Sequence, residues 1–174
     1  MHNQKKQRSG HRKYSKSHKP QELSRPSFQK AVQRYKAGLF QEAETLLESH
    51  LKRYPKDDAA LNLAGLIAYQ YGHYDSAIQL IQSAIRLNDR EHRYHNNLGA
   101  ALKDSGDPKG AISCFQKALD LNPDYCEASY NLGSSYQALG ELSLAMDWIE
   151  YTLSRNPELQ EAYNNKGNVY KDRA

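Results

Sequence analysis

The sequence predicts an all-α fold, an α-α superhelix of about four and a half helical hairpins that follows a basic N-terminal tail. Two observations predict it: small residues recur at a fixed offset of 34 residues, and the segments between them carry apolar residues at helical spacing. The recurrent positions are Gly65, Gly99, Gly133 and Gly167; Gly38, Gly72, Gly106 and Gly140; Ala43, Ala77, Ala111 and Ala145; and Pro55, Pro123 and Pro157, with Asp89 in the vacant place.

Residues 1–27 form the first predicted element, a disordered basic tail. They contain eight Lys or Arg against one Glu, a net charge of +7, whereas residues 28–174 carry −3. The tail has no apolar periodicity and is rich in Lys, Gln, Ser and His, a composition typical of disorder. It could make weak, salt-dependent contacts with nucleic acid or an anionic surface, or it could be a solubilising leader.

Residues 28–174 are predicted to form the repeat array, with units 28–57, 58–91, 92–125 and 126–159 and a half-unit 160–174. The third unit illustrates the hairpin, because Gly106 can end its first helix in the left-handed conformation. Asp107 can then cap the second helix, and Pro108 fits its first turn. Its two apolar stripes are Tyr94, Leu98, Ala101 and Leu102, and Ala111, Ile112, Phe115, Ala118 and Leu119.

Small and large residues in each unit have complementary predicted roles. Gly99 and Ala111 let two helix backbones approach closely, and Phe115 fills the wider gap between layers. The tyrosines at helical spacing are predicted to fill the core with a polar tip. The first unit departs most from the pattern, since Arg34 and His50 stand where the other units have apolar or small residues.

The half-unit 160–174 is more polar than the first halves of the other units. Lys166 replaces the leucine found at Leu98 and Leu132. The half-unit is either a solvating cap or an internal part of a longer array, and self-association through it is a further possibility.

The pattern of Leu98-Gly99, Leu102, Gly106, Ala111, Phe115, Ala118 and Pro123 resembles the tetratricopeptide repeat (TPR) signature, and the resemblance covers residues 28–174. The chain is most similar to the TPR arrays of O-linked N-acetylglucosamine transferases and related bacterial TPR proteins. In those arrays an asparagine ladder on the concave surface holds peptides. The resemblance implies the same role for Asn97, Asn131 and Asn165, and it fails at Leu63, so a peptide is expected mainly over units three to five.

Further polar side chains on the same helices are predicted to take part in peptide binding. They are Arg93, Asn96, Lys103, Tyr130, Gln137, Asn164, Asn168 and Lys171. The alternative is that the asparagines bond only to adjacent helices or water. The carboxylate clamp of another TPR subclass is excluded, since the positions it needs are occupied by Leu66, Ala100, Ser134 and Glu127.

No catalytic motif and no cofactor site is found in the sequence. His92 and His95 lie three apart without a third metal ligand, and Cys114 and Cys126 fit reduced structural thiols. No apolar run reaches the roughly 18 residues of a membrane span, and no secretory signal is present, so a cytoplasmic protein is expected. The predicted function is a non-catalytic scaffold for a protein or peptide, with the recruiting arm of a glycosyltransferase-like enzyme as an alternative.

Overall fold

The computed structural model describes residues 26–173, and every regular element in this range is an α-helix. The nine helices are α1 (Pro26–Lys36), α2 (Phe40–Arg53), α3 (Asp58–Gln70), α4 (Tyr74–Leu87), α5 (His92–Asp104), α6 (Pro108–Leu121), α7 (Cys126–Ala138), α8 (Leu142–Arg155) and α9 (Gln160–Asp172). The predicted all-α fold is confirmed. Within residues 26–173, no helix combines the length and the apolar character that crossing a membrane would require.

The first helix begins earlier than predicted. Pro26 and Ser27 belong to α1 rather than to the tail, because proline is well suited to the first turn of a helix. The rest of the predicted tail lies outside the described residues.

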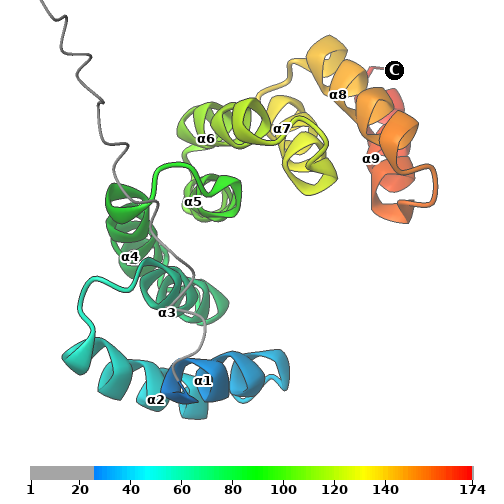
Figure 1. Cartoon of the computed structure of the whole chain (residues 1–174). Coiled ribbons are helices and arrows are strands. Elements are labelled where there is room, and N and C mark those ends of the chain that lie inside the picture. Colours follow the sequence, from blue (N-terminus) through cyan, green and yellow to red (C-terminus); the bar gives the residue numbers. More distant parts are fainter. Residues whose placement is uncertain (1–25, 174) are drawn as a thin grey trace, which may run out of the picture.

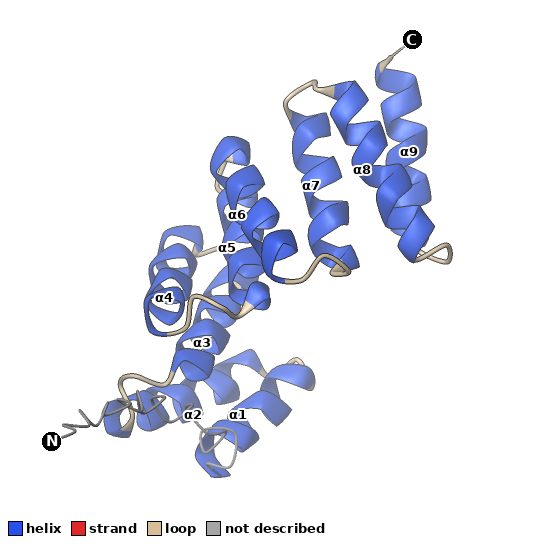
Figure 2. Cartoon of the chain, turned by 45° about the horizontal axis from the view of Figure 1, so that its top comes forward, coloured by secondary structure: helices blue, strands red, loops and turns tan. Residues whose placement is uncertain are grey.

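The helices are arranged as consecutive hairpins along a curved array. Each helix packs against its neighbours in the chain, and no contact joins helices more than two positions apart within the described range. Figure 1 shows the array running from α1 and α2 at one end to α9 at the other, and Figure 2 shows the short turns that connect the helices. This one-dimensional stacking is the predicted superhelix of about four and a half hairpins.

The turn between α5 and α6 illustrates how the sequence closes a hairpin. Gly106 has a φ of 95°, in the left-handed region that glycine adopts without steric penalty. The Asp107 side chain accepts a hydrogen bond from the Gly110 backbone N–H at 2.9 Å, and Pro108 occupies the first turn of α6. The three equivalent glycines also have positive φ, so the predicted turn chemistry is confirmed.

Close helix contacts explain the glycine series to which Gly65 and Gly99 belong. A Cβ on Gly99 would lie 2.6 Å from the Phe115 ring, and a Cβ on Gly65 would lie 2.6 Å from Ile81 and 3.2 Å from the Ala77 carbonyl oxygen. Side chains larger than hydrogen do not fit at such distances. The paired helices are therefore held together by glycine opposite a large apolar residue.

The core of the first unit contains a buried polar side chain, His50. The His50 side chain is 1% exposed, with its Nε2 2.8 Å from Asp57 Oδ2 and its Nδ1 2.8 Å from the Ser27 hydroxyl. Asp57 also caps α3 by accepting from the Ala60 backbone N–H. Because all these polar atoms have partners, the histidine can stand in the core and join α1, α2 and α3. Arg34 instead lies at the surface, 3.2 Å from Glu42.

Candidate functional site

The odd-numbered helices form the inner side of the curved array. Each contacts the next odd-numbered helix, whereas no two even-numbered helices are in contact within residues 26–173. Helices on the inside of a curve lie closer together than those on the outside, so the odd-numbered helices line the concave side. Figure 1 shows the even-numbered helices along the outer arc. We call the concave surface formed by α1, α3, α5, α7 and α9 the inner face.

Polar side chains that are 35 positions apart join successive odd-numbered helices. The four bonds are Asn97 Nδ2 to Asn62 Oδ1 (3.0 Å), Asn131 Nδ2 to Asn96 Oδ1 (3.1 Å), Gln137 Nε2 to Asp172 Oδ2 (2.8 Å) and the Tyr69 hydroxyl to Asp104. The offset exceeds the 34-residue repeat by one, so each bond joins non-equivalent positions of two successive units. These bonds order the polar side chains of the inner face before any ligand is present.

The predicted asparagine row occupies three successive odd-numbered helices. Asn97 on α5, Asn131 on α7 and Asn165 on α9 are all half-buried. Asn97 and Asn131 each donate one amide N–H to the preceding odd-numbered helix. The other N–H and the carbonyl oxygen of each of these two side-chain amides have no protein partner within residues 26–173.

Asn165 differs from the other two members of the row. Its side chain makes no hydrogen bond to any described residue. The reason is visible in the sequence, because Tyr130 stands 35 positions earlier, where the corresponding residues Asn62 and Asn96 offer an amide oxygen. The whole amide of Asn165 is therefore available for a ligand.

Asn96 is not available for direct contact with a peptide. It is 1% exposed, its Nδ2 donates to Glu127 Oε1 at 2.9 Å, and its Oδ1 accepts from Asn131. Burial with partners on both amide atoms corrects the prediction that Asn96 lines the binding surface. Asn96 is buried between α5 and α7, and it orients Asn131 by accepting the hydrogen bond from its side-chain amide.

The basic side chains predicted on α5 already have acidic neighbours. Arg93 is exposed and bonds Glu91 through two nitrogens, at 2.8 and 3.1 Å. The hydrogen bond from Arg93 lowers the pKa of Glu91, so the pair stays charged. Lys103 is half-buried with its Nζ 4.0 Å from Asp104. Both side chains are tied to local carboxylates, which weakens their attraction for an acidic ligand.

The predicted residues towards the C-terminal end of the array have fewer internal partners. Asn164, Asn168 and Lys171 are exposed, and no side-chain partner is found for them among residues 26–173. Tyr130 is half-buried and packs against the apolar cluster that includes Ile149. Among the predicted site residues, Asn96 and Asn97 on α5 are bonded to neighbouring helices, whereas Asn164, Asn165, Asn168 and Lys171 on α9 have no side-chain partner among residues 26–173.

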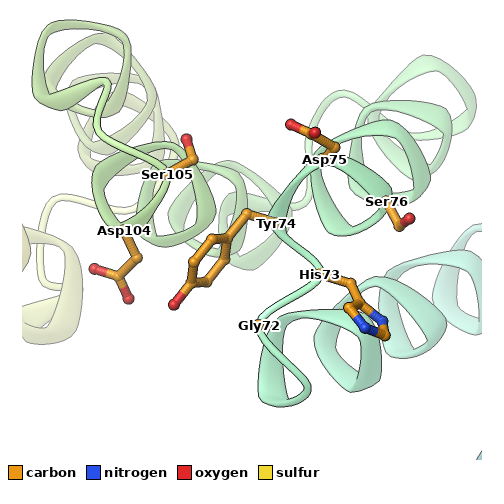
Figure 3. A pocket seen from close by; sticks show the side chains of 7 residues that line it. All are labelled: Gly72, His73, Tyr74, Asp75, Ser76, Asp104 and Ser105. Carbon is orange, nitrogen blue, oxygen red and sulfur yellow. The ribbon is translucent and has the colours of Figure 1, made fainter.

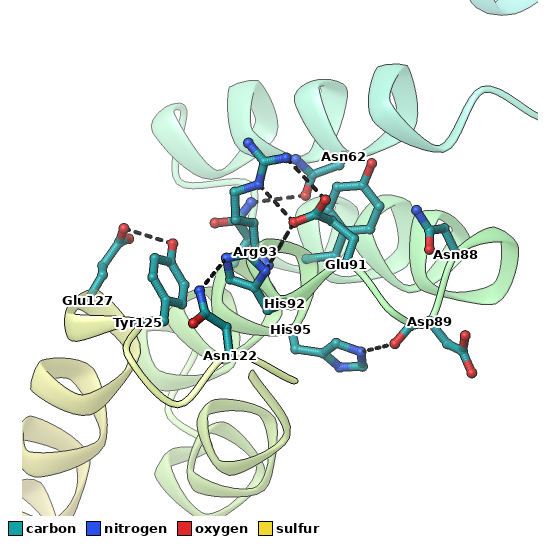
Figure 4. Close-up of polar contacts among 12 residues, drawn as sticks. Asn62, Asn88, Asp89, Glu91, His92, Arg93, His95, Asn122, Tyr125 and Glu127 are labelled. Carbon is teal, nitrogen blue, oxygen red and sulfur yellow. Dashed lines mark hydrogen bonds and ion pairs between the residues drawn. The ribbon is translucent and has the colours of Figure 1, made fainter. Parts of the chain in front are cut away.

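A second polar group lies where α5 and α7 begin (Figure 4), and the sequence analysis did not predict it. The Tyr125 hydroxyl donates to Glu127 at 2.9 Å, and the Tyr125 ring meets the His92 ring edge-on with 4.7 Å between centroids. His92 Nε2 lies 3.3 Å from Asn122 Nδ2. These residues flank the loop between α6 and α7, so they stiffen the junction of two units. The sequence feature that could have indicated this group is the polar residues next to the starts of the two helices, Glu91 before α5 and Asn122 and Tyr125 before α7.

His92 and His95 do not share a ligand position. His95 Nε2 is 2.9 Å from the Asp89 carbonyl oxygen, whereas His92 faces Asn122 and Glu91. Within the described part of the chain, no group of three metal-ligating side chains is found.

Tyrosine hydroxyls bonded to carboxylates link α3 to α5 at two points, and a third such pair is local to the start of α7. Burial, together with the neighbouring carboxylate, raises the pKa of each of these tyrosines above its ordinary value. The pairs are Tyr69 with Asp104, Tyr94 with Asp58 and Tyr125 with Glu127. At neutral pH these hydroxyls therefore stay protonated and act as donors.

A cavity of about 500 Å³ lies between the start of α4 and the end of α5, and no asparagine of the row lines it (Figure 3). It is formed by residues 72–73 of the α3–α4 turn, residues 74–76 at the start of α4, and Asp104 and Ser105 at the end of α5. Asp104 already accepts from Tyr69, and Asp75 is the other acidic group. The lining offers no set of convergent groups for a cofactor.

Comparisons with known proteins agree with this architecture. Family models described as tetratricopeptide repeat match residues 28–92, 92–125 and 114–147. No curated protein sequence matches the chain.

Solved structures with the same arrangement of helices include three helical repeat proteins. MamA is 26% identical over 84% of this chain and 80% of its own, with a TM-score of 0.74. YrrB, described as a TPR protein with an unusual peptide-binding site, is 21% identical over 88% of this chain and 79% of its own, with a TM-score of 0.71. The first TPR of Spaghetti (RPAP3), bound to the HSP90 peptide SRMEEVD, is 24% identical over 66% of this chain and 90% of its own, with a TM-score of 0.64.

Proposed function

The chain belongs to the tetratricopeptide repeat family, and we propose that it is a non-catalytic scaffold that binds an extended segment of a partner polypeptide on its inner face. YrrB and RPAP3 are peptide-binding proteins of the same fold. Their identity to this chain is low, so they support the fold, and the binding mode has to be argued from the residues of the inner face.

The free amide of Asn165 is the observation that carries this proposal. A primary amide offers a donor and an acceptor side by side, which complements the carbonyl and N–H groups of an extended backbone. Asn165 has both groups unbonded within the described residues, and it is only half-buried. Exposed Asn168 and Lys171 follow it on α9 and extend the polar surface.

Asn97 and Asn131 contribute in a different way. In each side-chain amide, one N–H and the carbonyl oxygen are left for a ligand, while the other N–H is held by the preceding odd-numbered helix. The held N–H fixes the orientation of the amide, which lowers the entropy lost when a peptide binds. A peptide over α5, α7 and α9 would thus meet two oriented amides and one free amide.

The expected affinity is modest. Two hydrogen bonds at each of three amides, at about 0.5–1.5 kcal/mol each, give about 3–9 kcal/mol. Association costs about 4–15 kcal/mol, so the row does not suffice alone. Contacts from Tyr130, Asn164, Asn168 and Lys171 have to supply the remainder, and this favours partners whose side chains fit the α7–α9 end.

The test is binding of a peptide selected from a displayed library against the full chain, measured by calorimetry. Asn165→Ala is expected to weaken binding roughly tenfold, which corresponds to one lost donor–acceptor pair at about 1.4 kcal/mol. Gln82→Ala, an exposed amide removed from the outer helix α4, is the matched control and should leave binding unchanged. Equal affinity for the chain and a triple variant lacking Asn97, Asn131 and Asn165 would reject the proposed surface.

The other interpretations of the sequence stay predictions. A recruiting arm of a glycosyltransferase-like enzyme would use the same inner face. Contact with nucleic acid or an anionic surface would depend on the tail, most of which lies outside the described residues.

A further inference from the structure

The helices that line the inner face differ in charge between its two halves. The sequence of α3 is DAALNLAGLIAYQ, in which Asp58 is the only charged residue. By contrast, α5 carries Arg93, Lys103 and Asp104, and α9 (QEAYNNKGNVYKD) carries four charged residues. The change falls between α3 and α5, at the point where the asparagine row ends.

Half-buried apolar side chains cover the part of the inner face that α1 and α3 form. Val32 and Tyr35 of α1 and Ala59 and Leu66 of α3 all pack against the same core cluster and keep part of their surface exposed. We call these four residues the apolar end. Unlike the residues of the asparagine row, they offer a ligand no hydrogen bond apart from the Tyr35 hydroxyl.

The apolar end lies on the same side of the helices as the polar residues further along. Val32 and Leu66 occupy the repeat position that is filled by Ala100, Ser134 and Asn168 in the later units, at the 34-residue offset. Asn168 is one of the exposed side chains that extend the polar surface at α9. A ligand that follows this position along the array therefore meets a polar side chain at one end and an apolar one at the other.

Helix α3 is covered on most of its sides by helices of this chain. It contacts α1, α2, α4 and α5, and no other helix among residues 26–173. A helix that is apolar around its circumference is normally covered on every side. Ala59 and Leu66 are covered only in part, so a further apolar group on the inner face would complete their burial.

The apolar end directly adjoins the asparagine row. Asn97 of α5 bonds Asn62 of α3 at 3.0 Å, and the Tyr69 hydroxyl of α3 bonds Asp104 of α5. A segment that lies along the row therefore passes from Asn97 onto α3 over a continuous surface. At Leu63, which is 7% exposed, the row has no amide, so attraction there has to come from apolar contact.

The spacing of the helices determines which residues of a bound segment can meet α3 and α1. Packed helices lie about 8–10 Å apart, and a polyproline II segment rises about 3.1 Å per residue with three residues per turn. Residues three positions apart in such a segment point the same way and lie about 9 Å apart. Its backbone makes no internal hydrogen bonds, so its N–H and C=O groups are free for the asparagine amides.

Residues 1–174 do not themselves supply such a segment. Met1, Tyr14 and Leu23 are the large apolar residues of the first 25, and no two of them are three positions apart. Between Pro26 and Asp172, the stretches outside the helices are turns of a few residues. The ligand that fits both halves of the inner face is therefore sought in a partner polypeptide.

We propose that one extended partner segment covers both halves of the inner face and carries two large apolar residues, three positions apart, at the end that lies over α3 and α1. Those two residues contact Leu66 and Val32, while the backbone of the rest of the segment bonds the asparagine row. This inference rests on the proposed function and names the class of partner. The row recognises the backbone, and the apolar end selects the side chains.

The probe is a displayed library of random peptides of about 15 residues, three for each of the five odd-numbered helices, selected against the full chain. The selected peptides should share two large apolar residues three positions apart near one end. Replacing both by asparagine should weaken binding at least tenfold in calorimetry. This comparison of two peptides uses the wild-type chain and needs no variant protein.

The matching change in the protein is Leu66→Asn, which should weaken binding of the selected peptide at least tenfold. The same variant should bind the asparagine-substituted peptide as well as wild type does, because the contact is already lost. Asn168 shows that the repeat accepts asparagine at this position. Leu144→Asn is the matched control, since Leu144 is 42% exposed on the outer helix α8, and it should leave binding unchanged.

Two results would overturn this inference and leave the asparagine row in place. They are selected peptides without the apolar pair, and equal affinity of wild type and Leu66→Asn for a peptide that the triple variant lacking Asn97, Asn131 and Asn165 no longer binds. The opposite pattern, a loss with Leu66→Asn and none with the triple variant, would reject the row and with it a single segment over both halves.

Discussion

Helices α5 and α9 occupy the same place in their repeats, and they differ in almost every contact. In α5, Gly99 lies against Phe115, Asn96 is buried between two polar partners, and Asn97 is bonded to α3. In α9 the equivalent Gly167, Asn164 and Asn165 have no such neighbours within the described residues. A repeated position fixes where the backbone goes, but the neighbouring helix decides whether a side chain serves stability or is left to bind.

The largest expected effect is on the alkylation rate of Cys114, which reports how α6 packs in the array. Burial, with the charge of Asp107, raises the pKa of Cys114 on α6 to about 11 from an ordinary 9.0. A raised pKa means less thiolate at pH 8, so alkylation by iodoacetamide should be about 100-fold slower than for an unperturbed thiol. The rate should rise tenfold per pH unit up to about pH 11, as followed by mass spectrometry of the peptide that contains Cys114.

The same chain in urea is the control for that rate, because unfolding exposes the thiol. If native and unfolded chains were alkylated equally fast at Cys114, the packing of α6 against α5 would be looser than the structure has it.

Adding a methyl group to the two glycines should have opposite effects on stability. Gly99→Ala forces the buried Phe115 ring to move and should lower the free energy of unfolding by about 1–3 kcal/mol. Gly167→Ala meets no atom and should raise it by about 0.5–1 kcal/mol, because alanine favours the helix more than glycine does. Urea unfolding followed by circular dichroism measures both, and a change of the same sign in both variants would contradict the comparison.

The asparagines that directly precede two of the row members, Asn96 before Asn97 and Asn164 before Asn165, give a smaller contrast. Asn96→Ala leaves Glu127 and Asn131 without their buried partner and should cost about 1–2 kcal/mol of stability. Asn164→Ala removes an exposed side chain and should stay within about 0.5 kcal/mol of wild type. Thermal unfolding of the two variants side by side checks this, and similar losses would show that α9 is covered in solution.

The smallest stability effect is expected within the row itself. Asn97→Ala loses one half-buried hydrogen bond and should cost about 0.5–1.5 kcal/mol, while Asn165→Ala should cost close to nothing. Urea midpoints of the two variants measure the difference. An equal loss at both positions would mean that Asn165 has a structural partner after all.

Sequence reasoning located the helices and turns because each depends on local chemistry. Gly106, Asp107 and Pro108 mark a turn whatever surrounds them, and the glycine opposite Phe115 follows from the 34-residue period. The partners of the asparagines could not be predicted in the same way. They depend on how the hairpins pack, because each bond joins residues 35 positions apart and the 34-residue period alone does not contain that offset.

The buried His50 is a second instance of the same limit. A histidine at a usually apolar or small position suggests weak packing, yet Asp57 and Ser27 satisfy both its ring nitrogens. Asp57 lies seven residues further along and has a separate role as the cap of α3, so only the fold brings the three side chains together.

The most direct test of the binding surface is an ¹⁵N-labelled full chain titrated with the selected peptide, observing side-chain amide resonances by NMR. The peptide should move the Asn165 NH₂ pair most, with smaller shifts at Asn97 and Asn131 and none at Gln82. Shifts confined to amides of the even-numbered helices, with Asn165 unmoved at saturation, would contradict the inner face as the place where the partner binds.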